Sequence, residues 1–237
     1  MRALPLLLVI ALGPLAVAAP TQAGRPDPVA AQPPYVRTVL TAEGSHYRYR
    51  PTDAGIRVAA GRLRGADENR REVFHQRGAE VTRDQGSCAT WHGATSPMAQ
   101  EGLAVRIRED GHRRRAVTLT KNTIFNVHYI FNILTWDTAR RGDPWRKVGQ
   151  FDMSGAVGAS PTRLYTLPWR VCLRVVDLRV SFLVWPLGRV ARPRWGNPTY
   201  SRHARLPRTF DVRGRPGWYV GHIPARGRIV YRNLTTW

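Results

Sequence analysis

Apolar and polar residues alternate with a period of two along most of the chain. In residues 102–109, Leu103, Val105 and Ile107 alternate with small or basic residues, which indicates a strand with one buried face. An Asp-Gly pair at positions 110 and 111 then predicts a hairpin turn into a second strand. Similar short segments, separated by turn residues, follow one another from residue 35 onward. We therefore predict roughly a dozen strands and an all-β fold of two packed antiparallel sheets.

The longest alternating stretch, residues 122–138, is predicted to be one central strand. One face carries only apolar side chains, namely Phe125, Val127, Tyr129, Phe131 and Ile133. The other face is mixed and carries Asn126, His128, Ile130, Asn132, Leu134 and Trp136. This division is typical of a strand with one face in the core and the other lining a cleft.

Residues 170–190 form the most apolar stretch outside the N-terminus. Charged residues interrupt this stretch at Arg170, Arg174, Asp177 and Arg179, so a bilayer-spanning segment is excluded. Apolar residues alternate on both sides of positions 176–178, which predicts a β-hairpin from the interior of a sheet.

The first residues have the pattern of a secretory signal peptide. Arg2 precedes an apolar run over residues 4–17, and small residues follow it up to residue 23. An N-terminal membrane anchor is the alternative, but the run falls short of the ~20 residues of a comfortable span. We expect a signal peptide over residues 1–23, a Pro-rich spacer over 24–34 and a single β-sandwich domain over 35–237. The mature protein would be secreted, extracellular or cell-wall associated, with no transmembrane segment.

The cysteines and the charge balance bear on the redox setting and on the partners of the protein. Cys88 and Cys172 are the only cysteines, and in an exported protein they are most simply one disulfide, with two buried free thiols as the alternative.

The net charge is +21, and all but two of the 37 basic residues are arginine. Codon bias in a GC-rich genome explains arginine over lysine. It explains less well why only 16 acidic residues balance the bases, so an anionic polymer is a candidate partner. No signature of a specific nucleic-acid-binding module occurs.

Several segments in this order resemble a known superfamily. They are "CATWHG", "TKNTIFNVHYIFNILTWDT", "GQFDM", "LPWRVCLRVVDLRVSFLVWP" and "PGWYVGHIPARGRIVYRNLTTW". Together they resemble secreted actinobacterial proteins of the concanavalin A-like lectin/glucanase superfamily, of the laminin-G-like kind, over roughly residues 70–237. The resemblance implies a concanavalin A-like jelly-roll β-sandwich. It implies no activity, because none is established for this group.

The motifs of catalysis and of metal binding are missing from the sequence. The superfamily's glucanases carry Glu-x-Asp-x-x-Glu on one strand, which aims two carboxylates into a cleft, and no strand here has it. No two of the seven histidines have zinc-motif spacing. Laminin-G-like domains often bind calcium, but the two candidate loops, residues 137–143 and 150–155, have arginines beside them. We predict no catalytic residue, no metal ligand and no cofactor, with calcium as a minor alternative.

Sugar binding is the chemistry that remains, because it needs aromatic faces and polar groups in one groove. The predicted concave-face candidates are Asn126, His128, Asn132, Trp136, Ser181, Trp185 and His222. The alternative is that these tryptophans pack in the core and that His128 is an ordinary sheet residue.

We expect an exported, non-catalytic carbohydrate-binding domain that acts at the cell wall or on extracellular glycans. One alternative is a glycoside hydrolase or lyase with an atypical acid arrangement. The other is a wall-retained structural protein that binds anionic polymer by charge.

Overall fold

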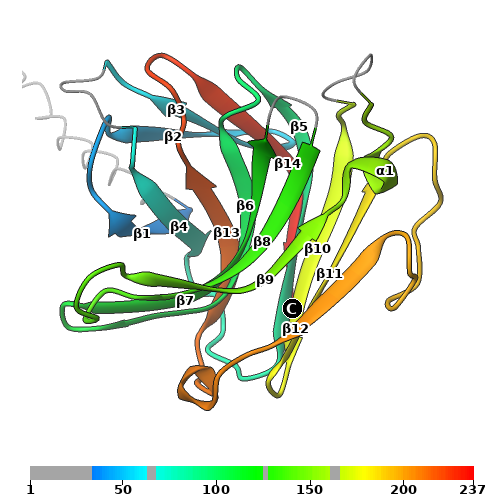
Figure 1. Ribbon diagram of the computed structural model, residues 1–237. Helices are drawn as coiled ribbons and strands as arrows, with labels where there is room; N and C mark the ends of the chain where they lie inside the picture. The colour runs from blue at the N-terminus through cyan, green and yellow to red at the C-terminus, as the bar shows by residue number, and fades with distance from the viewer. Residues whose placement is uncertain (1–33, 63–67, 125–127, 161–165) are drawn as a thin grey trace, which may run out of the picture. The chain divides into compact units, whose positions relative to one another are not determined.

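The computed structural model describes residues 34–62, 68–124, 128–160 and 166–237. Residues 33–237 form one compact unit, whose described part contains fourteen strands in two antiparallel sheets (Figure 1). The predicted all-β sandwich is therefore confirmed. A four-residue helix, α1 (Ser154–Val157), and a 3-10 turn, η1 (Arg208–Phe210), were not predicted.

Each sheet has seven strands, and neighbours in the following lists are hydrogen-bonded. Sheet A runs β1 (Tyr35–Thr41), β4 (Arg71–Gln76), β13 (Arg215–Gly221), β6 (Gln100–Asp110), β7 (Arg113–Ile124), β8 (His128–Asp137) and β9 (Trp145–Asp152). Sheet B runs β12 (Ser201–Arg205), β11 (Arg179–Pro186), β10 (Trp169–Val176), β5 (Gln85–Ala94), β14 (Arg228–Thr236), β3 (Gly55–Ala60) and β2 (Tyr47–Thr52).

Aromatic side chains from both sheets interlock in the core between them. The Phe131 ring of sheet A lies between two rings of sheet B, stacked on Trp91 and on Phe182 with centroid distances of 5.6 Å in both cases. Tyr129 and Ile133 share this face and are also buried. The apolar face predicted for residues 129–133 is thus the core face of β8.

Residues 122–138 do not form the single strand that the alternation predicted. The chain forms two strands here, β7 up to Ile124 and β8 from His128, and these two residues pair with each other in an antiparallel ladder. Alternation continues on both sides of residues 125–127, which contain no glycine or proline, and Asn126 is the one residue there of a type common in turns. Phe125, Asn126 and Val127 lie outside the described residues.

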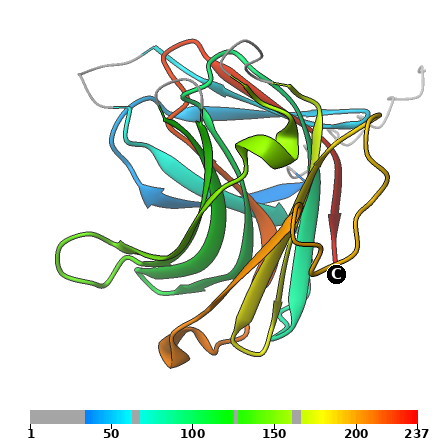
Figure 2. The same ribbon diagram turned by 45° about the vertical axis from the view of Figure 1, so that its right-hand side comes forward.

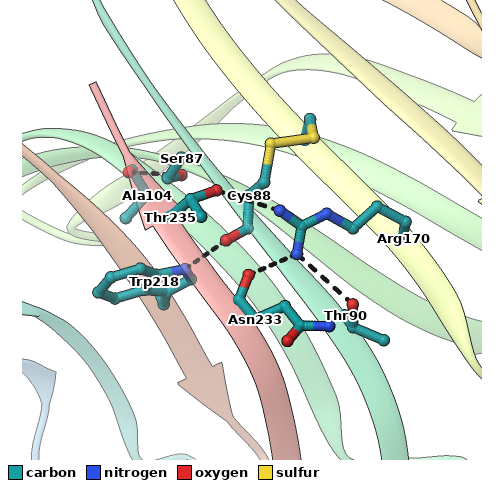
Figure 3. The surroundings of a disulfide bond; sticks show 9 residues. Ser87, Cys88, Thr90, Ala104, Arg170, Trp218, Asn233 and Thr235 are labelled. Atoms are coloured by element: carbon teal, nitrogen blue, oxygen red, sulfur yellow. Dashed lines mark hydrogen bonds between the residues drawn. A yellow bond between two sulfur atoms is a disulfide. The ribbon is translucent and has the colours of Figure 1, made fainter. Parts of the chain in front are cut away.

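Residues 170–190 do form the predicted hairpin, with β10 and β11 paired over their full length. Cys172 of β10 lies directly opposite Cys88 of β5, and the two form a disulfide across the sheet (Figure 3). The predicted disulfide is confirmed.

The C-terminal strand does not lie beside the first strand. Strand β14 pairs with β5 and β3 in sheet B, whereas β1 pairs with β4 at the edge of sheet A. The chain passes between the two sheets several times, and the last passage is the short segment that links β13 to β14.

The predicted signal peptide and most of the spacer lie outside the described residues. Within the part of the chain that is described, no helix has the length and apolar character needed to cross a bilayer.

Sheet A curls so strongly that part of its outer face is buried. Eight side chains on the face away from sheet B form a second apolar cluster: Leu40, Val73, Ala104, Ile107, Ala116, Leu134, Trp136 and Tyr219. The rings of Trp136 and Tyr219 have centroids 6.4 Å apart, although β8 and β13 are separated by two intervening strands. In a flat sheet, three strand spacings of ~4.8 Å would hold the two backbones ~14 Å apart. Figure 2 shows the bend in the green strands β6 to β8, which makes this face concave.

Candidate functional site

Small residues form the bottom of the concave face. On β6 and β7 these are Gly102, Ala104 and Ala116. A side chain at Gly102 would bring a Cβ within 2.7 Å of the Tyr219 ring and 2.4 Å of the Leu119 carbonyl oxygen. Glycine at position 102 is therefore what allows Tyr219 to lie across the strand.

Beside this bottom lies a pocket of about 420 Å³. Its described lining comes from sheet A and the adjoining loops and comprises Glu68, Arg71, Met98, Gln100, Thr120, Asn122, Thr123, Asn132, Leu134, Trp136, Trp145, Lys147 and His222. The volume lies within the range of ~300–1,000 Å³ that is usual for small-molecule sites. We refer to this set of residues as the sheet A pocket.

Two buried oxygen atoms in the sheet A pocket have no hydrogen-bond partner among the described residues. They are Thr120 Oγ1 and Asn132 Oδ1, from residues that are paired directly across β7 and β8. Buried polar atoms are nearly always hydrogen-bonded. These two adjacent oxygens are therefore exceptions to the usual pattern, and both belong to residues of one pocket.

A hydrogen-bonded chain of side chains forms the next part of the wall. The Tyr219 hydroxyl donates to Gln100 Oε1 at 2.8 Å, and the Gln100 amide donates to Asn122 Oδ1. Burial raises the pKa of Tyr219 above its ordinary value, so its hydroxyl remains a donor at neutral pH. This chain orients the amides of Gln100 and Asn122 before any ligand arrives.

The pocket rim is basic. Arg71 and Lys147 stand on opposite sides of it. Burial, with a further contribution from the Arg71 charge, lowers the pKa of His222 to about 4. His222 is therefore neutral at pH 7, and its ring can both donate and accept hydrogen bonds.

The two tryptophans of the pocket differ in exposure. Trp136 is fully buried, and its Nε1 donates to Thr118 Oγ1 at 2.9 Å. The Arg71 guanidinium lies over the Trp136 ring, 5.7 Å from its centroid, so that face is covered as well. Trp145, on the neighbouring strand and directly opposite Trp136, is only partly buried. The accessible aromatic surface therefore belongs to Trp145.

The structure brings three of the predicted site residues together. Asn132, Trp136 and His222 all line the sheet A pocket, although Trp136 lies beneath its surface. His128 is not in the lining, because it lies at the start of β8 and its Nδ1 is 3.0 Å from Asp152 Oδ2. Asn126 is outside the described residues.

Two predicted residues lie on a different surface, which corrects the expectation of one shared groove. Ser181 and Trp185 belong to β11 in sheet B and point away from the core, the latter into a cluster with the Cys88–Cys172 disulfide. Alternation had correctly grouped them on one face of their strand. That face is the outer face of sheet B, with the whole sandwich between it and the sheet A pocket.

The described lining of the sheet A pocket has few side chains that could act as acids or bind a metal ion. Glu68 is the only carboxylate in its described lining. Over the residues that the structure describes, no group of three or more His, Cys, Asp or Glu side chains could hold a metal ion.

Sequence reasoning did not identify Arg71, Gln100, Thr120, Trp145 or Lys147 as site residues. The sequence does contain a pattern that could have identified Thr120. Thr118, Thr120 and Asn122 alternate with the apolar core residues of β7, which indicates a polar face on that strand. The others come from strands or strand ends whose polar face could not be assigned to a groove without the pairing order.

Comparisons with known proteins give distant structural likenesses only. No protein-family model matches the chain, and no curated protein matches it by sequence. A carbohydrate-binding module, CBM66 from Bacillus subtilis, superposes with a TM-score of 0.47 and 9% identity, covering 84% of this chain and 94% of that one. A Bacillus subtilis protein of unknown function with a galectin-like fold gives a TM-score of 0.46 and 11% identity, with coverages of 85% and 88%. The exoplasmic/lumenal domain of VIP36, in a Ca²⁺/Man3GlcNAc-bound form, gives a TM-score of 0.42 and 10% identity, covering 86% of this chain and 84% of that one. Likenesses of this size do not say what the chain binds.

Proposed function

We propose that the chain is a carbohydrate-binding domain whose ligand occupies the sheet A pocket. The observation that carries the proposal is the pair of buried, unpartnered oxygen atoms, Thr120 Oγ1 and Asn132 Oδ1. A buried acceptor without a donor costs ~1–3 kcal/mol. A ligand that supplies two neighbouring hydroxyl groups would recover that energy on binding.

The rest of the lining fits a saccharide. Hydroxyl groups donate and accept, and the oriented amides of Gln100 and Asn122 offer both functions. The half-buried Trp145 ring offers an apolar face for the C–H surface of a sugar ring. Arg71 and Lys147 add donors at the rim and favour a ligand with partial or full negative charge.

We propose that this binding takes place outside the cell, at the cell wall or on extracellular glycans. Support comes from the disulfide, which persists in oxidising compartments, and from the signal-peptide pattern of residues 1–23. Membership of the laminin-G-like group remains a prediction from the sequence.

The described lining of the sheet A pocket favours glycan binding over glycan cleavage. Most glycoside hydrolases place two carboxylates about 5–9.5 Å apart on either side of the scissile bond. The described lining offers Glu68 alone. A glycoside hydrolase or lyase would need a second acid from elsewhere.

The test is calorimetric titration against a panel of neutral and acidic oligosaccharides, with Thr120→Val as the main variant. Valine keeps the shape of threonine but removes the unpartnered oxygen, so we expect stability to be unchanged or slightly higher and affinity to fall about fivefold or more. His128→Ala is the matched control, because His128 shares β8 with Asn132 but lies outside the pocket. The proposal fails if no glycan binds, or if His128→Ala weakens binding and Thr120→Val does not.

A further inference from the structure

The strands of sheet B contain many arginines and no acidic residue. Ten arginines lie in its seven strands: Arg48, Arg50, Arg57, Arg170, Arg174, Arg179, Arg202, Arg205, Arg228 and Arg232. The strands of sheet A, by contrast, include Glu72, Glu101, Glu109, Asp110, Asp137 and Asp152. Codon bias explains a preference for arginine over lysine, but it does not explain why acids are confined to one of two sheets.

Strand alternation places nine of these ten arginines on one face. Core residues such as Val171, Leu173 and Val175 point toward sheet A, so Arg170 and Arg174 point outward. The same reasoning applies to the other strands, and only Arg202 is turned toward the core side, because it pairs with the core residue Phe182. Six of the seven strands contribute at least one outward arginine, and most of these side chains are exposed.

No salt bridge among the described residues neutralises the charge of this face. Every ion pair found among the described residues involves sheet A or the loops, and none includes one of the nine outward arginines. Burial, together with the charge of Arg192, lowers the pKa of Arg170. Burial, together with the charge of Arg179, lowers the pKa of Arg174 in the same way. Like charges therefore face each other here without intervening carboxylates.

Three tryptophans lie among the arginines. Trp195 is covered by the Arg174 guanidinium, whose central carbon is 4.1 Å from the ring centroid. Trp237 is 53% exposed and packs over Gly86, where a side chain would collide with it at 2.1 Å. Two hollows of about 380 and 500 Å³ lie on this face, lined respectively by Trp185 with Trp237 and by Trp195. No acidic residue is found in the described lining of either hollow.

The arginines are arranged in rows across the strands. One row runs from Arg232 through Thr90 to Arg170 and Trp185, each residue directly opposite the next. Arg170 is held in place by the Asn233 carbonyl oxygen and by the Thr235 hydroxyl at 3.1 Å (Figure 3). With strands ~4.8 Å apart, the backbones of Arg232 and Arg170 lie two strand spacings, ~10 Å, from each other.

We propose that the outer face of sheet B is a docking surface for an acidic polysaccharide, separate from the sheet A pocket. A guanidinium pairs with a carboxylate in bidentate fashion, and the exposed tryptophan surface offers apolar faces for sugar rings. The partner is a polymer rather than a small anion, because the charges extend over six strands. We take it to be a polysaccharide rather than a nucleic acid because this inference rests on the extracellular setting proposed above, with which the disulfide in this face agrees.

The experiment measures binding of the full chain to immobilised polygalacturonate, a linear chain with one carboxylate on each ring, over a series of salt concentrations. The test variant combines Arg50→Ser, Arg57→Ser and Arg232→Ser, all exposed arginines of sheet B. The control combines Arg141→Ser, Arg146→Ser and Arg208→Ser, which removes the same charge from exposed positions outside sheet B.

We expect the test variant to bind about tenfold more weakly at low salt and to depend less steeply on salt concentration. The control should stay within about twofold of the unmodified chain. A polymer bound across sheet B should bind equally well to Thr120→Val, which alters only the sheet A pocket. A loss with this variant would mean that the polymer occupies the pocket instead, so this proposal and the previous one can fail separately.

Three outcomes would overturn the docking surface. Equal losses in the two triple variants would mean that net charge alone acts. Binding of single-stranded DNA or polyphosphate to this face more tightly than polygalacturonate would mean that the partner class is wrong. Retention of full affinity by the test variant would mean that the polymer binds elsewhere.

Discussion

Replacing the two tryptophans of the sheet A pocket one at a time should show that Trp136 contributes to stability and Trp145 to ligand binding. Trp136→Phe removes the indole N–H that serves Thr118 Oγ1, and both side chains are fully buried. The orphaned hydroxyl costs ~1–3 kcal/mol and the smaller ring leaves a cavity, so the free energy of unfolding should fall by ~2–4 kcal/mol. Ligand affinity should change by less than about threefold, because the ring does not reach the surface.

Trp145→Ala should show the opposite pattern. Its ring is only partly buried, so the free energy of unfolding should fall by ~1 kcal/mol or less. Loss of a stacking face should weaken glycan binding by ~1–2 kcal/mol, which is about five- to thirtyfold in Kd.

The assays are urea unfolding followed by circular dichroism, and calorimetric titration with whichever oligosaccharide the unmodified chain binds. The reasoning is refuted if Trp136→Phe folds as stably as the original but loses binding. It is also refuted if Trp145→Ala binds normally. The first result would mean that the ligand contacts Trp136, and the second that it does not stack on Trp145.

Three further changes test other parts of the structure. Replacing Cys88 and Cys172 together by alanine removes the disulfide, which joins two residues 84 positions apart in the sequence. We expect the free energy of unfolding, measured with urea, to fall by ~4–5 kcal/mol. Arg106→Met removes a fully buried guanidinium that donates to the carbonyls of Asp177 and Phe210, and stability should fall by ~2–5 kcal/mol in the same assay. His222 has a pKa of about 4 when folded, below its unfolded value of ~6.5. The unfolded chain therefore binds the extra proton between these values, stability should fall as pH drops from 6.5 to 4, and His222→Asn should flatten that part of the curve.

Local pattern was enough to predict the strands and their faces. Tyr129, Phe131 and Ile133 were predicted to share the core face, and they do. The hairpin over residues 170–190 was predicted as well, because a period of two is a property of each strand by itself. The change from β7 to β8 between Ile124 and His128 was missed, since the apolar alternation continues through this segment and Asn126 alone is of a type common in turns.

The pocket itself depended on contacts between distant residues. Asn132 was a candidate from its strand face, but only the pairing of β7 with β8 places its free oxygen next to that of Thr120. Trp136 was predicted to be a binding surface, yet the curl of sheet A brings Tyr219 and Arg71 to it and buries it.

By itself, the sequence determined that this is an all-β chain with two faces to each strand, a strong excess of arginine and a pair of cysteines able to bridge. Only the tertiary structure decided which face belongs to which sheet. The same alternation describes Asn132 and Trp185, although they lie on opposite outer surfaces of the sandwich. It also decided that every acidic residue within a described strand belongs to sheet A, while the strands of sheet B carry ten arginines. The physical reason is that side-chain period is set within a strand, whereas strand order, curl and the neighbours across a sheet are set by long-range packing.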